Sequence, residues 1–242
     1  MPVNNEWYHS LGDTWWDPNG VVAALHEVTP VRVGYFCDVL GDMADKRVVE
    51  LGCGGGLMAE EYARRGAHVV GIDRSVPTLR AAQRHAASGG FVIQYVGSLA
   101  EGLPFADGAF DAVVTADTLE HVDDLEQVVS EAARVLKPGG RFVYDTVNRT
   151  WKSRLLLEWL PQRVFRIVPP DTHDYRQFVR PAELHALLAR HGLTNCETRG
   201  LALRRHPLAA AVSYARRRRL GGFIISNDLG MSYLGFAIKG SS

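Results

Sequence analysis

The sequence predicts an α/β fold in which helices cover both faces of a mostly parallel sheet. From residue 47 onward, short apolar stretches alternate with stretches of helical character, a pattern typical of a parallel sheet with crossover helices. Glycine or proline clusters separate them, as at 52–56 and 138–140. The 242 residues are 46% hydrophobic and 22% charged, so the chain is globular and long enough to bury a large core.

Five strands are expected in the region of regular alternation, each on a short apolar run that ends at a turn signal. They cover 47–51, 67–73, 91–96, 110–116 and 141–147, and the fourth contains the buried run Ala-Val-Val-Thr-Ala. Two more strand candidates lie near 194–203 and 232–239.

The helices between these strands are bounded by glycine and proline. We expect helices at 57–65, 77–87, 125–136 and 181–191, and the last is followed by Gly192, where a left-handed residue is favoured. Two regions depart from the alternation. Residues 1–46 are expected to be mainly helical, and residues 151–180 form an insertion after the fifth strand, with a break at Pro161.

Charge and cysteine content exclude several classes of protein. Lys and Arg total 27 and Asp and Glu total 27, a balance that argues against a dedicated nucleic-acid binder. The N-terminus lacks the pattern of a signal peptide, and no apolar run approaches the about 18 residues of a membrane span. The widely spaced Cys37, Cys53 and Cys196 indicate neither a disulfide framework nor zinc, and they fit a cytoplasmic location.

A glycine-rich turn follows the first strand. Gly52-Cys53-Gly54-Gly55-Gly56 leads into a helix, an arrangement typical of nucleotide binding, and Asp73 at the end of the second strand can accept hydrogen bonds from ribose hydroxyls. Residues 54–59 also match the dinucleotide pattern G-x-G-x-x-A. The glycines alone therefore leave three interpretations: NAD, another adenosine ligand, or a tight turn without a ligand.

Further motifs decide between these interpretations. They are Glu-Leu-Gly-Cys-Gly-Gly-Gly from Glu50, Leu-Pro-Phe at 103–105, Phe-Asp at 110–111, Leu-Glu-His-Val at 119–122 and Leu-Lys-Pro-Gly-Gly at 136–140. In this order the set resembles the class I S-adenosylmethionine-dependent methyltransferases. The resemblance implies a Rossmann-like sheet of seven strands with the last strand antiparallel.

The flanking segments narrow the resemblance. Trp15-Trp16-Asp17, Pro30-Val31-Arg32 and Thr172-His173-Asp174 are similar to segments of the ubiquinone-biosynthesis O-methyltransferases, which methylate catechols and phenols that bear a polyprenyl chain. The similarity runs from about Trp15 to Lys239. It implies one domain over 1–242, with a helical cap at 1–46, the cofactor-binding core at 47–150, a lid at 151–180 and the end of the sheet at 181–242.

The resemblance also assigns the cofactor contacts. The loop would face the methionine part, Asp73 the ribose and Arg32 the carboxylate, for which a planar guanidinium is well suited. Ser98 and Leu99 would flank the adenine, and Ala116 would contact the adenosine. The full expected set is Arg32, Glu50, Gly52, Cys53, Gly54, Asp73, Arg74, Ser98, Leu99, Ala116 and Asp117.

Three polar residues lie beyond the fourth strand, where ligands bind in such sheets: Asp117, Glu120 and His121. A phenol is mostly neutral at pH 7, so it needs a base or a metal to become a good nucleophile. The three side chains fit a Mg²⁺ site, which the resemblance supports. In a second interpretation His121 alone is the general base, and in a third Glu120 and His121 only begin a helix.

Other residues are candidates for the acceptor site. Trp15 and Trp16 form either part of a cap over the acceptor or an anchor for the N-terminal segment, and His173 and Asp174 either reach the acceptor or stabilise their loop. Residues 151–170 combine apolar side chains with basic ones, so they either lie on a membrane surface or pack as a lid. The arginines at 216–219 form a solvated surface or attract anionic lipid or an acidic substrate.

We therefore expect a methyltransferase that acts on a small phenolic or catechol acceptor, with S-adenosylmethionine as cofactor. The alternatives are methylation of a small specialised metabolite or an amine without metal, an NAD-dependent oxidoreductase, and a binding module without activity. The sequence leaves the oligomeric state open.

Overall fold

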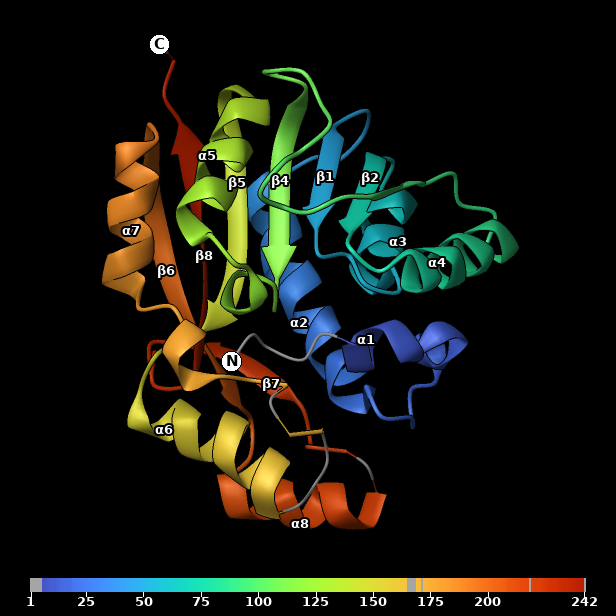
Figure 1. Ribbon diagram of the computed structural model, residues 1–242, viewed down its shortest axis with the longest axis vertical. Helices are drawn as coiled ribbons and strands as arrows, with labels where there is room; N and C mark the ends of the chain where they lie inside the picture. The colour runs from blue at the N-terminus through green and yellow to red at the C-terminus, as the bar shows by residue number, and fades with distance from the viewer. Residues whose placement is uncertain (1–5, 165–168, 171, 218, 242) are drawn as a thin grey trace.

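The computed structural model describes residues 6–164, 169–170, 172–217 and 219–241. Its centre is an eight-stranded sheet of order β3-β2-β1-β4-β5-β8-β6-β7 (Figure 1). The strands are β1 Arg47–Leu51, β2 His68–Asp73, β3 Gln94–Gly97, β4 Phe110–Ala116, β5 Leu136–Val147, β6 Leu193–Leu203, β7 Phe223–Ser226 and β8 Ser232–Lys239.

The sheet confirms the predicted fold class. The strands β3, β2, β1, β4 and β5 are parallel, and β8 lies antiparallel between β5 and β6. The sheet has one strand more than the seven expected, because β7 pairs antiparallel with the second half of β6. This pairing satisfies backbone groups of β6 that would otherwise form an open edge.

Helical elements occupy both faces and the end of the sheet where the parallel strands finish (Figure 1). They are α1 Glu6–Ser10, η1 Gly12–Trp16, α2 Ala23–Leu40, α3 Leu57–Arg64, α4 Val76–Ser88, η2 Leu119–His121, α5 Leu125–Val135, α6 Trp151–Ser153, η3 Arg154–Val164, η4 Tyr175–Gln177, α7 Pro181–Arg190 and α8 Pro207–Arg217.

Two apolar clusters form the core, one on each face of the sheet. On one face, Val49 and Val113 pack with side chains of α5 and α7. On the other face, Val48 and Val114 pack with side chains of α2 and α3. Neighbouring residues of a strand point to opposite faces, so a continuous apolar run supplies both clusters.

The insertion differs from its prediction. Pro161 lies inside η3, a π-helix that continues α6, so the expected break at Pro161 is wrong. In a π-helix the bonds join residues five apart, and this wider turn accommodates a proline near the end of the helix. Phe165, Arg166, Ile167 and Val168 of the predicted insertion lie outside the described residues, as do Asp171 and Arg218.

The C-terminal region contains a helix that the sequence did not predict, α8, which ends at Arg217. Arg216 and Arg217 are exposed, which agrees with the solvated interpretation of these two arginines. Arg219 donates a hydrogen bond to Asn19 at 3.3 Å. Within the described ranges, no helix is both long and apolar enough to cross a membrane.

Candidate active site

A cavity of about 810 Å³ opens at the carboxyl ends of the parallel strands, within the range of small-molecule and cofactor sites. Most of the predicted site residues line it. They are Trp15, Arg32, Glu50, Gly52, Cys53, Gly54, Asp73, Arg74, Ser98, Leu99, Ala116, Asp117, Glu120, His121 and His173.

The glycine loop between β1 and α3 is shaped by close neighbours as well as by its turn. A Cβ atom on Gly52 would lie 2.2 Å from the Thr118 hydroxyl oxygen, and one on Gly55 would lie 2.6 Å from the Cβ of Trp15. Gly52 also has a φ of 68°, which favours glycine. Because Gly52 and Gly55 have no side chains, Thr118 and Trp15 can pack directly against the backbone of the loop.

Asp73 connects this loop to the next helix. Its carboxylate accepts the backbone N–H of Gly54 at 3.0 Å and that of Ser75 at 2.8 Å. Ser75 is the N-cap of α4. The carboxylate of Asp73, which we expect to bind the ribose, is therefore held in place between the glycine loop and the start of α4. Burial raises the pKa of Asp73, and the two backbone N–H groups oppose that rise.

The N-terminal segment covers the glycine loop. Trp15 is buried against the loop, and the indole N–H of Trp16 donates to the Gly55 carbonyl at 3.0 Å. The Trp16 ring stacks on His85 of α4, with centroids 3.4 Å apart and planes 4° from parallel. Trp16 therefore lies outside the cavity lining and anchors the cap, whereas Trp15 both anchors the cap and lines the cavity.

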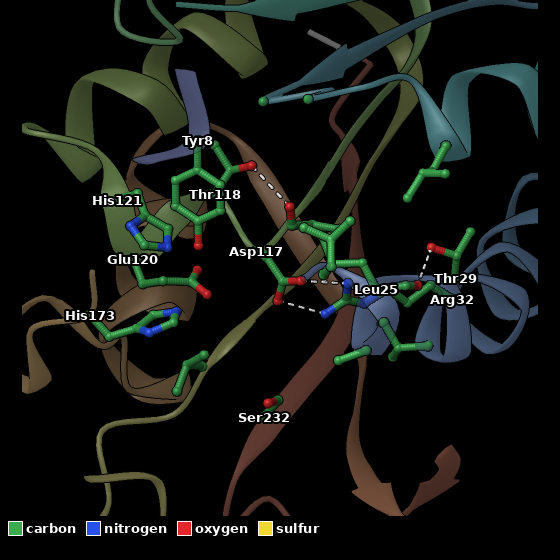
Figure 2. A pocket seen from close by; sticks show the side chains of 18 of the residues that line it. Tyr8, Leu25, Thr29, Arg32, Asp117, Thr118, Glu120, His121, His173 and Ser232 are labelled. Carbon is green, nitrogen blue, oxygen red and sulfur yellow. Dashed lines mark hydrogen bonds and ion pairs between the residues drawn. The ribbon is translucent and has the colours of Figure 1, made fainter. Parts of the chain in front are cut away.

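Arg32 of α2 is the centre of a buried ion network. Its two terminal nitrogens donate to the two carboxylate oxygens of Asp117 at 2.6 Å each, and one of them also donates to Asp145 at 2.6 Å. We expected Arg32 to hold the carboxylate of the cofactor. In the structure, its bidentate partner is Asp117, a carboxylate of the protein itself (Figure 2).

Two carboxyl groups, Asp117 and Asp145, share this single guanidinium, and the Glu120 carboxyl lies near enough to interact with its charge. Burial would raise the pKa of Asp117, but the Arg32 charge and hydrogen bonds bring it below its ordinary value. Burial and the Asp117 charge raise the pKa of Glu120 to about 8. Burial likewise raises the pKa of Asp145 to about 7, although Arg32 opposes this. Asp117 is therefore the ionised member, and Glu120 holds a proton at neutral pH.

The expected Mg²⁺ site does not form in this arrangement. Asp117 has a left-handed backbone, with a φ of 49°, and both of its carboxylate oxygens face Arg32. Glu120 accepts a hydrogen bond from Thr146 at 2.6 Å. In the part of the chain that the structure describes, no group of three or more His, Cys, Asp or Glu side chains could hold a metal ion. The residues present thus do not fit the cation.

Two histidines approach each other beside Glu120 (Figure 2). The rings of His121 and His173 are 5.3 Å apart, and the Nδ1 atom of each is buried with no hydrogen-bond partner among the described residues. Burial, followed by the neighbouring His173, lowers the pKa of His121 to about 3. The imidazole is therefore neutral at pH 7.

Asp174 does not join this group. Its carboxylate caps η4 by accepting the backbone N–H of Arg176 at 2.9 Å, and it pairs with the Arg176 guanidinium at 2.6 Å. These contacts favour the loop-stabilising interpretation of Asp174, while His173 lines the cavity.

Sequence reasoning missed other residues of the cavity, among them Tyr8, Thr118 and Glu101. Thr118 could have been predicted from the sequence, because it directly follows Asp117 at the carboxyl end of β4, where ligands bind in such sheets. Tyr8 could not have been predicted, since the packing of its five-residue helix in the tertiary structure is what places it at the cavity.

Comparisons with known proteins agree with this geometry. A family model described as a methyltransferase domain matches residues 49–144. A magnesium protoporphyrin IX methyltransferase from Synechocystis, solved with bound S-adenosylhomocysteine, superposes with a TM-score of 0.68 at 18% identity, covering 97% of both chains. A SAM-dependent methyltransferase from Thermotoga maritima gives a TM-score of 0.66 at 20% identity, covering 97% of this chain and 99% of that one. The family model and the fold thus define a SAM-dependent methyltransferase.

Curated relatives refine this class. Ubiquinone biosynthesis O-methyltransferase from Burkholderia pseudomallei is 36% identical over 94% of this chain and 92% of its own length. The protein of the same name from Ralstonia nicotianae is 36% identical over 96% and 92%. The chain belongs to the family of the ubiquinone biosynthesis O-methyltransferases. This membership overturns the NAD-dependent oxidoreductase as an alternative.

Proposed function

We propose that this enzyme methylates a hydroxyl group of a phenol or catechol, with His121 as the general base. The observation that carries the proposal is the His121 imidazole, which is neutral, lines the cavity and has an unpartnered Nδ1 atom. The imidazole is unprotonated before each turnover, and the Asp117 charge, which raises the pKa of His121 against the effect of burial, stabilises the imidazolium that forms. A neutral phenol requires such a group to take its proton.

S-adenosylmethionine supplies a methyl group on a sulfonium, which is electrophilic without help from the protein. The chain aligns the two reactants: the loop at 52–54 and Asp73 orient the cofactor. His121 takes the phenol proton as the new oxygen–carbon bond forms and the carbon–sulfur bond breaks. The remaining task is to exclude water, to which the cap formed by α1 and η1 contributes.

The shape of the cavity supports an acceptor with an apolar ring or chain. Beyond the polar group at the end of β4, the lining includes Leu156, Leu157 and Leu160 from η3, with Ala210 of α8 and Phe223 of β7. In Figure 1, the insertion and α8 lie together beneath the sheet. A quinone precursor fits this division into a polar end and an apolar end, and the names of the curated relatives point the same way.

The test measures methyl transfer to matched acceptors. The panel contains a catechol, the same catechol with alkyl chains of increasing length, and an aniline of similar size. We expect turnover of the catechols, a lower KM with longer chains, and no loss of activity with a chelator. Preferential methylation of the aniline would favour the specialised-metabolite alternative, and dependence on added Mg²⁺ would contradict His121 as the sole base.

A variant links the activity to the proposed base. We expect His121→Gln to lower kcat by about 10²- to 10⁴-fold, the usual contribution of general base catalysis. The matched control is His185→Gln, because His185 bonds to the Thr198 hydroxyl at 2.9 Å and is not among the residues that line the cavity. Equal activity of the two variants would remove His121 from the mechanism.

A further inference from the structure

We infer that Tyr8 binds the acceptor, with its phenol hydroxyl on the oxygen adjacent to the one that is methylated. This inference rests on the proposed function and extends it, because it selects acceptors with two neighbouring oxygens. Tyr8 belongs to α1, a short helix far from the motifs that define the family.

The position of Tyr8 is the first argument. Tyr8 lines the cavity, and Figure 2 shows its hydroxyl directed toward the carboxyl group of Glu120, on the same wall as His121. Its ring meets the His121 ring edge to face, with centroids 5.8 Å apart. The hydroxyl thus lies close to the group that is proposed to take the proton.

The support of the Tyr8 ring is the second argument. The ring stacks on Trp15 with centroids 6.3 Å apart, and it contacts Trp7 edge to face at 4.9 Å. The Tyr8 carbonyl accepts a hydrogen bond from the Thr78 hydroxyl of α4 at 3.2 Å. These contacts fix the side chain from both sides, so its hydroxyl meets a ligand with little loss of conformational freedom.

The chemistry of the hydroxyl is the third argument. Burial, the Asp117 charge and the Glu120 charge raise the pKa of Tyr8 well above its ordinary value, so the phenol stays neutral at working pH. A neutral phenol both donates and accepts hydrogen bonds. It can therefore bind the second hydroxyl of a catechol while His121 receives the proton of the first.

The cap formed by α1 and η1 contacts both the acceptor side of the cavity and the glycine loop. Tyr8 and Trp15 belong to one segment, and that segment also packs on the glycine loop through Trp15 and Trp16. One wall of the acceptor site is thus built by the same residues that cover the cofactor. Loss of the Tyr8 hydroxyl should affect the acceptor without affecting the cofactor.

The experiment compares two acceptors and two variants. Tyr8→Phe keeps the ring contacts and removes only the hydroxyl. Tyr35→Phe is the control, because it removes a hydroxyl that bonds to Glu197 at 2.9 Å and is not part of the cavity lining. The acceptors are a catechol and the corresponding phenol, which lacks the neighbouring hydroxyl. Acceptor affinity is also measured by calorimetry on the complex with S-adenosylhomocysteine.

We expect Tyr8→Phe to lower kcat/KM for the catechol about three- to tenfold, the value of one hydrogen bond, and to weaken catechol binding by a similar factor. The phenol should be unaffected, and the affinity for S-adenosylhomocysteine should stay within about twofold. Tyr35→Phe should leave the turnover of both acceptors unchanged.

An equal loss of kcat/KM on both acceptors in Tyr8→Phe would assign Tyr8 a structural role, and no loss on either would overturn the contact. Failure of the wild-type enzyme to methylate any phenol would overturn the proposed function, and the calorimetry would still decide the Tyr8 contact.

Discussion

Arg32 shows how a single residue can determine the electrostatics of the site. It is buried, and it neutralises carboxylates that approach from the end of β4 and from β5. The side chain of Asp145 is completely buried, so its carboxyl group has no access to water. A buried charge without a partner is much more costly than an exposed one.

We therefore expect Arg32→Met to lower the free energy of unfolding by about 3–5 kcal/mol at pH 7, measured by urea denaturation. The control is Arg64→Met, because Arg64 is exposed and pairs with Glu61 on the surface. That variant should change the stability by less than about 1 kcal/mol. Equal stability of Arg32→Met and wild type would mean that Asp117 is not charged in the folded protein.

Glu120 makes stability depend on pH. Its pKa rises from the ordinary 4.5 to about 8 in the folded protein, chiefly through burial and the Asp117 charge. Between these values the folded protein keeps a proton that the unfolded chain has released. The stabilisation from this group is therefore complete below about pH 4.5 and is lost as the pH rises through about 8.

Thermal unfolding of wild type and Glu120→Gln between pH 5 and pH 9 measures this effect. Wild type should lose stability relative to the variant as the pH rises, by an amount on the order of kcal/mol. Glu50 also has a raised pKa, but it is present in both proteins and cancels in the comparison. Parallel curves would show that Glu120 ionises normally.

At the scale of elements, η1 connects the N-terminal segment to the glycine loop. Trp16 carries this connection through its stack on His85 and its hydrogen bond to Gly55. His85 is held in turn by Glu60 of α3 at 2.7 Å. The cap, α3 and α4 therefore meet around one indole ring.

We expect Trp16→Ala to weaken S-adenosylhomocysteine binding by up to about thirtyfold, because an aromatic stack and a hydrogen bond each contribute about 1 kcal/mol. Calorimetry measures this affinity. Trp151→Ala provides a matched control, since Trp151 is 71% exposed on α6. If both variants bind like wild type, the cap does not contribute to cofactor affinity.

At the scale of the whole molecule, η3 has one row of apolar side chains in the cavity and another row exposed on the surface. Leu156, Leu157 and Leu160 line the cavity, whereas Leu155 and Trp159 are 38% and 52% exposed. The inner row makes η3 one wall of the cavity. We propose that the outer row contacts a membrane surface, from which an apolar acceptor would enter, since exposed apolar side chains beside basic ones suit the interface.

Cosedimentation with phosphatidylglycerol vesicles tests this surface. The double variant L155A/W159A should bind the vesicles roughly tenfold more weakly. It removes apolar surface that would otherwise be buried in the membrane, about as much as one large side chain buries. Its turnover of a water-soluble catechol should match wild type. Val92→Ala, at a side chain that is 95% exposed between α4 and β3, should bind as wild type does. Binding unchanged in L155A/W159A would leave η3 as a wall of the cavity only.

Much of the core could be predicted because its signals are local. β1, β4 and β8 begin and end where the sequence places them, since apolar runs end at charged residues or turns. β3 begins three residues later than expected, at Gln94, and β5 begins earlier, at Leu136. β7 and α8 were missed, because β7 is only four residues long and pairs only along the end of β6.

The sequence by itself determined the parallel core, the glycine loop and the acid at the end of β2, since strand period, turn residues and their order along the chain suffice for these. The tertiary structure alone decided that Arg32 pairs with Asp117 and Asp145, which are 85 and 113 residues away. It also decided that Tyr8 faces Glu120 and that Trp16 stacks on His85. The physical reason is that such contacts depend on how α1, η1 and α2 pack against the end of the sheet, and long-range packing has no periodic trace in the sequence.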